Sequence, residues 1–485
     1  MKALKEINGL LMRQRSRLAK LFDKRQLRRT REYAFKQAHR LRGLPNVRSD
    51  VCAKTDDQRL LINCRLLDPA NMVRAIGLKY QDGKVQWIQD ELLHYRTSPT
   101  SLSKAVLAPG QPDRFCGLLS STQPCERVKH LTLKLDSGKT KTIDLDVKER
   151  STPALSLITQ LLTLVPKDNE EKRRAFDHGI GPIIQQLWQT RVKAPDKGRM
   201  VTFNKLDNAK QPEVSLVIPI YGRFDFIEYQ LAQFTNDEFM HEQEIIYVVD
   251  DPRISDEVIH SCRALARIYH LPFKVLLLEN NLGYAGANNI GVAQSSGKNI
   301  LLLNSDVFVE SGGWLKKLLD SVNHDLSGIL LGTRLKYHDE SIQHDGMSFQ
   351  ASPFNGNLWI NIHPGKGLPD DQFARRSEPQ ERECVTGACL LLSRDDFLQL
   401  GGLDENFILG DFEDSDLCMK ARNHNMRILL AEHVSLYHLE RQSQTLVTGQ
   451  RWKQELTYYN CWQHSMKWDE QIMQLKQESV GERKH

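Results

Sequence analysis

The sequence predicts an α/β protein in which a wound, mixed sheet follows a small β-rich domain and a basic N-terminal helical segment. Three observations predict this arrangement. The first 50 residues are strongly basic, residues 51–150 contain two hairpin patterns, and residues 214–303 alternate strand-sized apolar runs with helical stretches. At roughly 100–200 residues per domain, 485 residues suffice for two to four domains.

Composition argues against several classes of protein. With 40% hydrophobic and 26% charged residues the chain can bury a core, which disfavours global disorder and a fibrous architecture. No run approaches the ~18 consecutive apolar residues of a membrane-spanning helix, and the N-terminus lacks the apolar core of a signal peptide. The nine cysteines form no Cys-x-x-Cys pair, which favours reduced thiols over disulfides or a zinc site. We therefore expect a soluble, cytoplasmic protein.

Residues 1–50 hold 15 Lys and Arg against 4 Asp and Glu, a net charge of +11 in a chain whose total is +5. Apolar residues recur between the basic ones at roughly helical spacing. One interpretation is an amphipathic helix within residues 1–45 on the anionic inner face of the cytoplasmic membrane, where each basic group contributes about 1 kcal/mol. The other is a solvated helix packed on the next domain or on a partner. Few aromatic residues are present to stack on bases, so we expect no nucleic-acid partner.

Two hairpin patterns follow the basic segment. Residues 75–80 and 85–88 flank an Asp-Gly turn, which supplies the positive φ of a tight turn. Residues 130–135 and 140–147 alternate apolar and polar side chains with the period of two expected for half-buried strands. These patterns predict a small antiparallel β domain, a sandwich, at about 51–150. The sequence does not indicate its function.

The strands after residue 213 are near-continuous apolar runs, as expected for strands covered on both faces. Helical stretches separate them, and this alternation predicts a wound, parallel sheet whose ligands bind beyond the carboxyl ends of the strands. Three of those ends carry polar residues: Asp250-Asp251, Asn280-Asn281 and Asn304-Ser305-Asp306. The predicted strands are 214–220, 244–250, 274–278 and 299–303, and the predicted helices are 224–234, 255–269 and one from 285.

These patterns divide the chain into four predicted parts. The basic helical segment covers residues 1–50, and a β-rich accessory domain covers 51–200, including helices over 154–193 and a linker at 194–213. The wound-sheet domain covers 201–445, and a C-terminal helical extension covers 446–485.

Six motifs follow one another in the second half of the chain. They are Val217-Ile-Pro-Ile-Tyr221, Val248-Val-Asp-Asp251, the Gly-containing segment 280–291, Leu302-Leu-Asn-Ser-Asp-Val307, 385–393 and 402–418. Their order and spacing resemble the inverting family 2 glycosyltransferases of the GT-A fold, and among these the rhamnosyltransferase-like enzymes of bacterial surface polysaccharide synthesis. The resemblance covers about residues 213–445.

The resemblance implies a nucleoside-diphosphate sugar donor and a divalent cation, Mg²⁺ or Mn²⁺. Asn304-Ser305-Asp306 stands where the family has its Asp-x-Asp-like metal motif. Because its first position is Asn304, Asp306 must hold the cation, which would neutralise the departing diphosphate. Ser305 would touch the ribose, and His438 would complete the metal site. The alternative is that Asp306 closes a turn or caps a helix and that His438 is structural.

The resemblance also implies that Asp250 and Asp251 bind the nucleotide. An Asp at this position can accept from the N3–H of uracil or thymine, which points to a UDP- or dTDP-linked donor. The family continues with Asn-x-Ser-x-Asp, whereas this chain has Pro252-Arg-Ile-Ser-Asp256, so the base preference stays open. The alternative is that both carboxylates are held by backbone N–H groups. The other residues implied in nucleotide-sugar binding are Pro219, Tyr221, Asn281, Gly283, Gly286 and Asn289.

Glu413-Asp414 is the pair that the resemblance implies for catalysis. Inverting transfer needs a carboxylate that takes the proton from the acceptor hydroxyl, and Asp414 would be this base. Glu413 would orient the site or bind acceptor hydroxyls, and two adjacent like charges would raise one pKa. The alternative is an acidic helix start favoured by the helix dipole. His344 resembles a recurring acceptor-side segment.

The sequence thus predicts an inverting transferase that moves rhamnose or another hexose from a nucleoside-diphosphate donor to a polysaccharide or lipid-linked glycan. A nucleotidyltransferase is one alternative, but it would need a Gly-rich, basic phosphate loop after the first strand, where residues 221–223 are too short. A non-catalytic glycan- or nucleotide-binding protein on a transferase fold is another. The joint presence of Asp306, Glu413, Asp414 and His438 argues against it.

Overall fold

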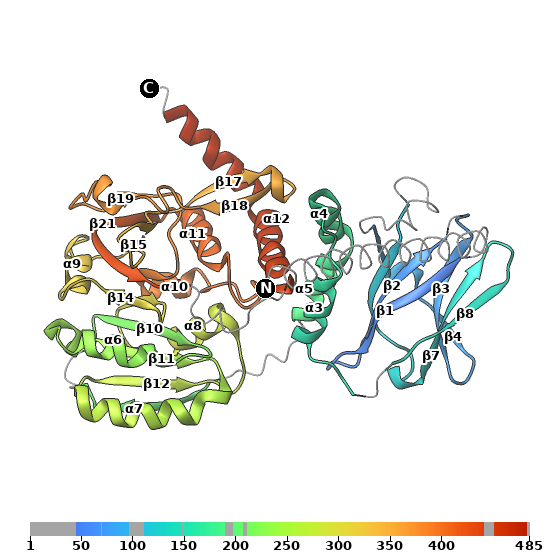
Figure 1. Cartoon of the computed structure of the whole chain (residues 1–485), viewed down its shortest axis with the longest axis horizontal. Helices are drawn as coiled ribbons and strands as arrows, with labels where there is room; N and C mark the ends of the chain where they lie inside the picture. The colour runs from blue at the N-terminus through green and yellow to red at the C-terminus, as the bar shows by residue number, and fades with distance from the viewer. Residues whose placement is uncertain are drawn as a thin grey trace, which may run out of the picture. The chain divides into compact units, whose positions relative to one another are not determined.

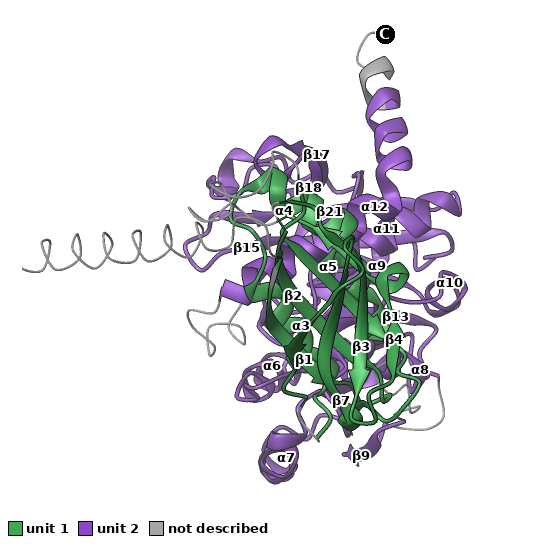
Figure 2. Cartoon of the chain, turned by 90° about the vertical axis from the view of Figure 1, so that its right-hand side faces the viewer, with its two compact units in different colours: residues 1–191 green, residues 192–485 purple. Residues whose placement is uncertain are grey.

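The computed structural model describes residues 45–68, 70–96, 111–147, 150–189, 197–206, 211–440 and 451–482. The chain forms two compact units, Met1–Arg191 and Val192–His485, shown by sequence position in Figure 1 and by unit in Figure 2. The predicted basic segment lies outside the described residues as far as residue 44, and its last residues belong to strand β1. None of the described helices is both long and apolar enough to cross a membrane. The nine cysteines all occur as free thiols.

Unit 1 contains two four-stranded antiparallel sheets, in the orders β1-β2-β6-β5 and β4-β3-β7-β8. Both predicted hairpins are present, as β3 with β4 and β7 with β8, and Gly83 and Gly138 have the positive φ of their turns. Leu60 and Ile62 of the first sheet share one core with Ile76 and Leu131 of the second, as in a sandwich. The bounds are β1 Asn46–Lys54, β2 Leu60–Leu67, β3 Val73–Tyr80, β4 Val85–Trp87, β5 Leu93–Tyr95, β6 Arg114–Leu119, β7 Val128–Leu135, β8 Thr140–Asp144, α3 Ala154–Thr163, α4 Asn169–His178 and α5 Ile180–Gln189.

Unit 2 is built on an 11-stranded mixed sheet in the order β14-β21-β15-β20-β13-β10-β11-β12-β9, with β16 beside β15 and β19 beside β21. The four strands predicted from apolar runs form its parallel centre, and helices connect them as predicted. In chain order these elements are β10 Val214–Ile220, α6 Phe226–Phe234, β11 Glu244–Val249, α7 Ser255–Tyr269, β12 Phe273–Leu277, α8 Gly283–Ala293 and β13 Asn299–Leu303.

Strand β10 shows why the central strands are apolar throughout. Leu216 and Ile218 contribute to the core on one face of the sheet, whereas Val217 contributes to the core on the other. Helices cover both faces, so alternation of apolar and polar residues would place polar side chains in a core. The remaining elements are β14 Val307–Val309, α9 Trp314–Asp320, β15 Ile329–Lys336, β16 Ile342–His344, β17 Ser348–Ser352, β18 Leu358–Ile362, β19 Gln380–Glu381, β20 Cys389–Ser393, α10 Arg394–Gln399, α11 Glu413–Asn423, β21 Arg427–His438 and α12 Arg451–Glu482.

The linker predicted at 194–213 contains a strand, β9 (Arg199–Phe203), which pairs antiparallel with β12 and forms the edge of the sheet. The composition of the surrounding residues, rich in Lys, Asp and Asn, concealed it. Val201 and Phe203 pack on the core, and the Phe203 ring stacks on Phe273 with centroids 4.9 Å apart. The apolar residues at alternate positions therefore suffice for this segment to form an edge strand, although most of the residues around it are polar.

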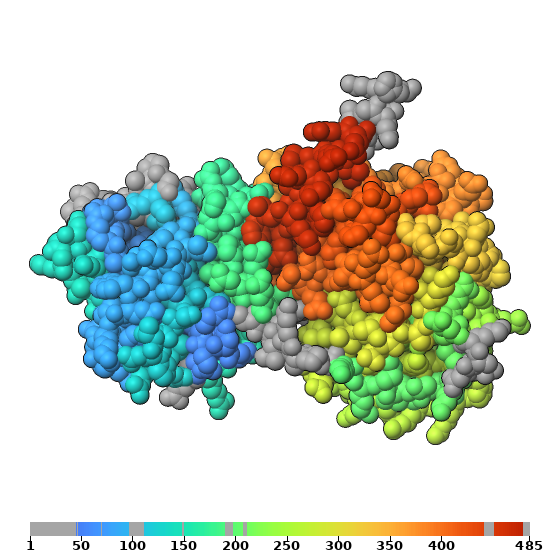
Figure 3. All heavy atoms as spheres, turned by 180° about the vertical axis from the view of Figure 1, so that it is seen from behind, coloured from blue at the N-terminus to red at the C-terminus, as the bar shows by residue number. Residues whose placement is uncertain are grey.

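Helix α12 forms part of unit 2 rather than a separate extension of the chain. Trp468 and Ile472 are buried in the same core as Leu417 and Met419 of α11. In the space-filling view of Figure 3 the red atoms of this helix lie against the orange atoms that precede it in the sequence.

Candidate active site

The short segment Thr386-Gly387-Ala388, just before β20, joins two sides of the candidate site. Asn304, directly after β13, donates its N–H to the Ala388 carbonyl at 2.9 Å. Gly387 donates its N–H to Asp414 Oδ2 at 3.0 Å. The metal motif at the end of β13 and the acidic start of α11 therefore meet at one edge of the sheet, which is where wound sheets bind ligands.

Asp306, Asn304 and His438 come together where β14 pairs with β21. Val307 is opposite His438 in the antiparallel register, so the preceding Asp306 adjoins the imidazole. His438 Nε2 lies 3.2 Å from Asp306 Oδ1 and 3.4 Å from Asn304 Nδ2. The two predicted metal-site residues are thus neighbours, although 132 positions separate them in the sequence.

Gln343 fixes the tautomer of His438. Gln343 Nε2 donates to the His438 carbonyl at 3.0 Å, so Gln343 Oε1, 2.6 Å from Nδ1, accepts the proton that Nδ1 carries. In the neutral ring Nε2 then holds a lone pair that faces the Asp306 carboxylate. A cation or a further proton between these two acceptors would stabilise the arrangement.

The residues at this position suit a cation whose remaining ligands are oxygen atoms of the substrate. Asn304 Oδ1 is buried and has no hydrogen-bond partner within the described structure, so it is a third polar atom beside Asp306 and His438. In the described part of the chain no group of three or more His, Cys, Asp or Glu could hold a metal ion. A hard cation here would complete its coordination with diphosphate oxygens and water.

Asp250 and Asp251, at the end of β11, are both held within the protein. Asp250 accepts from the backbone N–H of Leu282 at 2.6 Å and of Gly283 at 2.9 Å, which ties β11 to the loop before α8. Asp251 accepts two side-chain hydrogen bonds from Arg253, at 2.8 and 2.7 Å, and these bonds lower its pKa. Asp250 therefore makes the contacts expected of the alternative, in which N–H groups at the start of a helix hold the carboxylate. Its role in nucleotide binding stays a prediction.

Tyr221 and Arg253 lie together beyond the ends of β10 and β11. The Tyr221 side chain is 40% exposed, and the Arg253 guanidinium lies 5.8 Å from its ring centre. Pro219 lies within β10, and Ser305 is half-buried in the metal motif. Tyr221 thus offers a face on which a base can stack.

The predicted glycine loop is packed closely against another part of the same domain. Gly283 has a φ of +75°, and a Cβ there would lie 2.9 Å from Leu409 Cα. A Cβ on Gly286 would lie 2.6 Å from Leu282 Cβ. Close packing therefore explains why both positions are glycine. Contact of these glycines with a nucleotide-sugar stays a prediction.

The two asparagines of this motif also have partners inside the protein. Asn281 Oδ1 accepts from the Gly283 N–H at 2.9 Å. Asn289 exchanges two hydrogen bonds of 2.9 Å with the backbone of Leu403. Asn289 thus anchors the segment that leads to α11, a role that the sequence did not predict.

Glu413 and Asp414 begin α11 with their carboxylates in a poorly solvated position. Asp414 accepts hydrogen bonds from Gly387 and, at 2.7 Å, from the N–H of Ser415. Glu413 is 7% exposed, and its Oε2 has no partner within the described structure. Burial raises the pKa of both groups, and for Glu413 the charges of Asp414 and Asp411 raise it further. The raised pKa belongs to the pair, which shares protons.

His344 and His363 form a second group of neutral rings beside this pair. The Thr386 N–H points to His344 Nε2 at 3.4 Å, so His344 Nδ1 carries the proton and donates to His363 Nδ1 at 3.2 Å. Burial lowers the pKa of both, of His363 to about 4. His363 therefore carries its proton on Nε2 and is joined through His344 to Thr386, in the segment before β20. His363 lies in none of the motifs, so sequence reasoning missed it.

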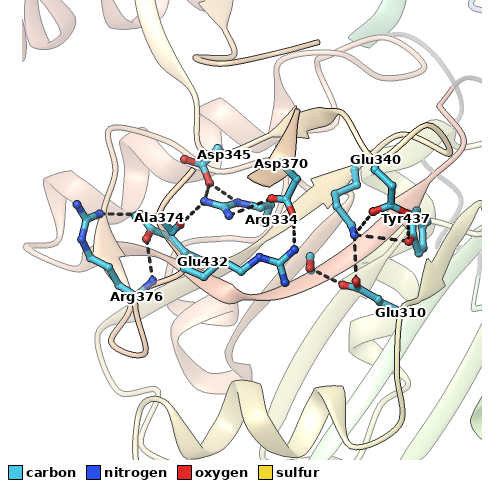
Figure 4. Close-up of polar contacts among 12 residues, drawn as sticks. Glu310, Arg334, Glu340, Asp345, Asp370, Ala374, Arg376, Glu432 and Tyr437 are labelled. Atoms are coloured by element: carbon cyan, nitrogen blue, oxygen red, sulfur yellow. Dashed lines mark hydrogen bonds and ion pairs between the residues drawn. The ribbon is translucent and has the colours of Figure 1, made fainter. Parts of the chain in front are cut away.

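A buried ionic network anchors the strands that carry His344 and His438 (Figure 4). Arg334, 1% exposed, contacts Asp345 at 2.7 Å and Asp370 at 3.1 Å. Lys336, equally buried, contacts Glu310 at 3.0 Å and Glu340 at 2.6 Å. Because Asp345 directly follows His344, the network positions the acceptor-side segment.

Comparison with known proteins identifies the domain. Residues 215–400 match the family model "Glycosyl transferase family 2". This part of the chain is therefore similar to the glycosyltransferases of family 2. The predicted fold class, a GT-A-type wound mixed sheet preceded by a small β-rich domain, is confirmed.

Curated relatives also match part of the chain. It is 28% identical over 231 residues to the uncharacterized protein y4gI of Sinorhizobium fredii, and 27% over 239 residues to the O-antigen biosynthesis protein RfbC of Myxococcus xanthus. Each match covers 47% of this chain, and 24% and 17% of those proteins. The low-salt glycan biosynthesis hexosyltransferase Agl10 of Haloferax volcanii is 25% identical over 34% of this chain and 51% of its own length. The chain thus spans about half or less of each of these relatives.

Similar solved structures include GalNAc-T7 with UDP, GalNAc and Mn²⁺. The TM-score is 0.38 at 15% identity, over 48% of this chain and 44% of that one.

Replacing Glu413 by Gln is expected to stabilise the protein at neutral pH. A carboxyl whose pKa is raised by folding contributes stability below its unfolded pKa, and this stability is lost as the pH rises through the folded pKa. Gln does not titrate, so the melting temperature of Glu413→Gln should exceed that of the wild type increasingly from about pH 4.5 upward. Thermal unfolding at a series of pH values measures this difference.

Glu432→Gln is the matched control with the opposite sign. Burial raises the pKa of Glu432, but bonds from Arg382 and Arg376 outweigh it and lower the pKa overall. The wild-type carboxylate therefore stabilises above its unfolded pKa, and Glu432→Gln should melt lower at neutral pH, with the deficit fading in acid. Equal pH dependence of the two variants would contradict the raised pKa of Glu413.

Arg334→Met is expected to destabilise unit 2 by up to about 3–5 kcal/mol, because it removes the fully buried cation between Asp345 and Asp370. Each carboxylate then keeps only a more exposed partner, Arg382 for Asp345 and Arg375 for Asp370. Arg427→Met is the control, since Arg427 pairs with Glu381 at the surface, where the side chains are 59% and 70% exposed. That variant should change stability little. Denaturant unfolding of both variants measures the difference, and equal effects would refute the structural role of the network.

Proposed function

We propose that residues 201–445 form an inverting, metal-assisted glycosyltransferase. It would transfer a hexose, rhamnose among the candidates, from a UDP- or dTDP-linked donor. One observation carries the proposal: within a family 2 domain, segment 386–388 joins the Asp306–His438 pair to Asp414. A cation that binds the diphosphate and a carboxylate base can therefore act on the same donor molecule.

In the proposed reaction, Asp414 accepts the proton of the acceptor hydroxyl as its oxygen attacks the anomeric carbon. The bond between that carbon and the diphosphate oxygen breaks on the opposite face, which inverts the configuration. Burial and the neighbouring Glu413 raise the pKa of the acidic pair, which suits a base that works near neutral pH. Asp306 and His438 would hold the cation, which neutralises charge on the leaving diphosphate when bound.

The acceptor in this proposal is a growing polysaccharide or its lipid-linked precursor. The names of the relatives RfbC and Agl10, which mention O-antigen and glycan biosynthesis, support this class of acceptor. The basic residues 1–45 suit an anionic membrane surface, where lipid-linked acceptors lie.

Asp414→Asn should lower the rate of transfer by about 10²–10⁴-fold, the usual contribution of a positioned base. Binding of the nucleotide-sugar should persist, because the change removes a charge without altering the size of the side chain. A panel of nucleotide-sugars with Mn²⁺, followed for diphosphate release, identifies the donor and then compares the variants. Asp395→Asn, on the exposed surface of α10, is the control. Near-normal turnover by Asp414→Asn would show that Asp414 is not the base.

Asp306→Ala should instead weaken nucleotide binding in the presence of Mn²⁺ or Mg²⁺. Because the effect passes through the cation, binding measured with a chelator should be equally weak for the variant and the wild type. Calorimetric titration with the nucleoside diphosphate, with and without metal, tests this. An Asp306→Ala protein that keeps metal-dependent affinity would contradict the proposed metal site.

A further inference from the structure

The loop that leads into the acidic pair has an unusual backbone. Four consecutive residues have positive φ: Leu409 at +64°, Gly410 at +146°, Asp411 at +76° and Phe412 at +76°. Three of them carry side chains that disfavour this region. Such residues persist only where the surroundings hold them, and they cluster at functional sites. Glu413 is the next residue, so the position of the acidic pair depends on what holds this loop.

Helix α12 holds the loop from one side through Asn460, which is fully buried. Its Oδ1 accepts from the Ile408 N–H at 3.1 Å. Its Nδ2 donates to the carbonyls of Ile408 at 3.1 Å and Gly410 at 2.5 Å. One amide side chain thus binds both ends of the first turn of the loop. One helical turn earlier, Thr457 donates its hydroxyl to Asp411 Oδ2 at 2.6 Å.

The contacts continue along one face of α12. The buried ring of His464 lies beside Phe412 with centroids 5.4 Å apart. Trp468 Nε1 donates to Asp416 Oδ1 at 2.8 Å. Together with Thr457 and Asn460, these positions are three or four residues apart, which places them on a single face of a helix. This face follows the chain from Ile408 to Asp416, across the acidic pair.

The donor-side loop contacts the same strained loop. Gly283 packs against Leu409 so closely that a Cβ would lie 2.9 Å from Leu409 Cα. The Tyr284 N–H donates to the Leu409 carbonyl at 3.2 Å. Asp250 in turn holds Gly283 by its backbone N–H. Residues 408–412 are therefore clamped between the loop implied in nucleotide-sugar binding and helix α12.

We propose that α12 is part of the catalytic apparatus and that Asn460 is a positioning residue for the Glu413–Asp414 pair. Asn460 touches neither carboxylate, and it acts by holding the backbone of residues 408–410. The inference rests on the proposed function, because it concerns the alignment of the base with the bound donor. It assigns a role to the C-terminal helix, for which the sequence predicted only an extension.

Asn460→Ala should lower kcat by about 10–10²-fold, the usual effect of a small misplacement of a reacting group. The KM for the nucleotide-sugar should change little, because the proposed metal residues are held by strand register and not by residues 408–412. Asp306 directly precedes β14, and His438 ends β21. The acid limb of the pH–rate profile should move as well, since the environment of the pair changes. A purely structural role would lower the active fraction and leave the shape of that profile unchanged.

Two further variants separate positioning from folding. Thr457→Val keeps the size of the side chain and removes the bond to Asp411, so it should show a smaller kcat defect of the same kind. Gln474 lies on the exposed surface of the same helix, where its Nε2 donates to Glu478 at 3.0 Å, and Gln474→Ala should behave as wild type. Should Asn460→Ala not fold, Thr457→Val carries the test.

The full chain is assayed with the donor identified from the nucleotide-sugar panel, and circular dichroism checks that each variant is folded. A kcat defect with unchanged KM and a moved acid limb supports the inference. Wild-type kcat and pH profile in folded Asn460→Ala, or in Thr457→Val where the former does not fold, would overturn it. If the wild type itself transfers no sugar from any donor, the proposed function fails instead, so the two failures are distinguishable.

Discussion

The burial of two adjacent carboxylates, Glu413 and Asp414, is the constraint on which this site depends. Removing carboxylates from water is costly unless they are hydrogen-bonded or protonated. Asp414 receives backbone hydrogen bonds from Gly387 and Ser415, whereas Glu413 Oε2 receives none within the described structure. The pKa of each group is therefore raised, that of Glu413 by the charge of Asp414 as well as by burial. This state persists only because the surrounding segments leave the carboxylates no alternative position.

The two halves of the site are fixed by different means. Asp306 and His438 are set by strand register, with Val307 opposite His438 and the Leu439 N–H bound to the Asp306 carbonyl at 3.1 Å. Ladder hydrogen bonds of this kind define positions within a rigid sheet. Asp414 is instead set by a loop with positive φ values that owes its conformation to α8 and α12. Sheet geometry thus fixes Asp306 and His438, the proposed metal residues, and tertiary contacts fix Asp414, the proposed base.

The sequence predicted what depends on local pattern and could not predict what depends on tertiary contact. Four apolar runs predicted β10 to β13 because these strands are covered on both faces. Strand β9 was missed because the segment is polar and its sequence alone does not reveal that it pairs with β12. The same limit applies to the site. Asp306 lies in a motif and His438 was implied by the resemblance, whereas His363 and Asn460 matter through contacts with residues far away in the chain. Asn289, predicted to bind the nucleotide-sugar, bonds to the backbone of Leu403, a contact that no local pattern indicates.

Several conspicuous residues of the motifs are explained by how the loops hold one another. Asp250 binds the N–H groups of Leu282 and Gly283, Gly283 makes room for Leu409, and the Leu409 carbonyl accepts from Tyr284. The Tyr284 hydroxyl then donates to the Gly387 carbonyl at 2.6 Å, while the Gly387 N–H binds Asp414. A continuous set of contacts therefore runs from the end of β11 to the base. Asp250, at the end of β11, can therefore help to position Asp414 as well as fulfil its predicted role in nucleotide binding. The loop at residues 282–284 links it to the segment that holds Asp414.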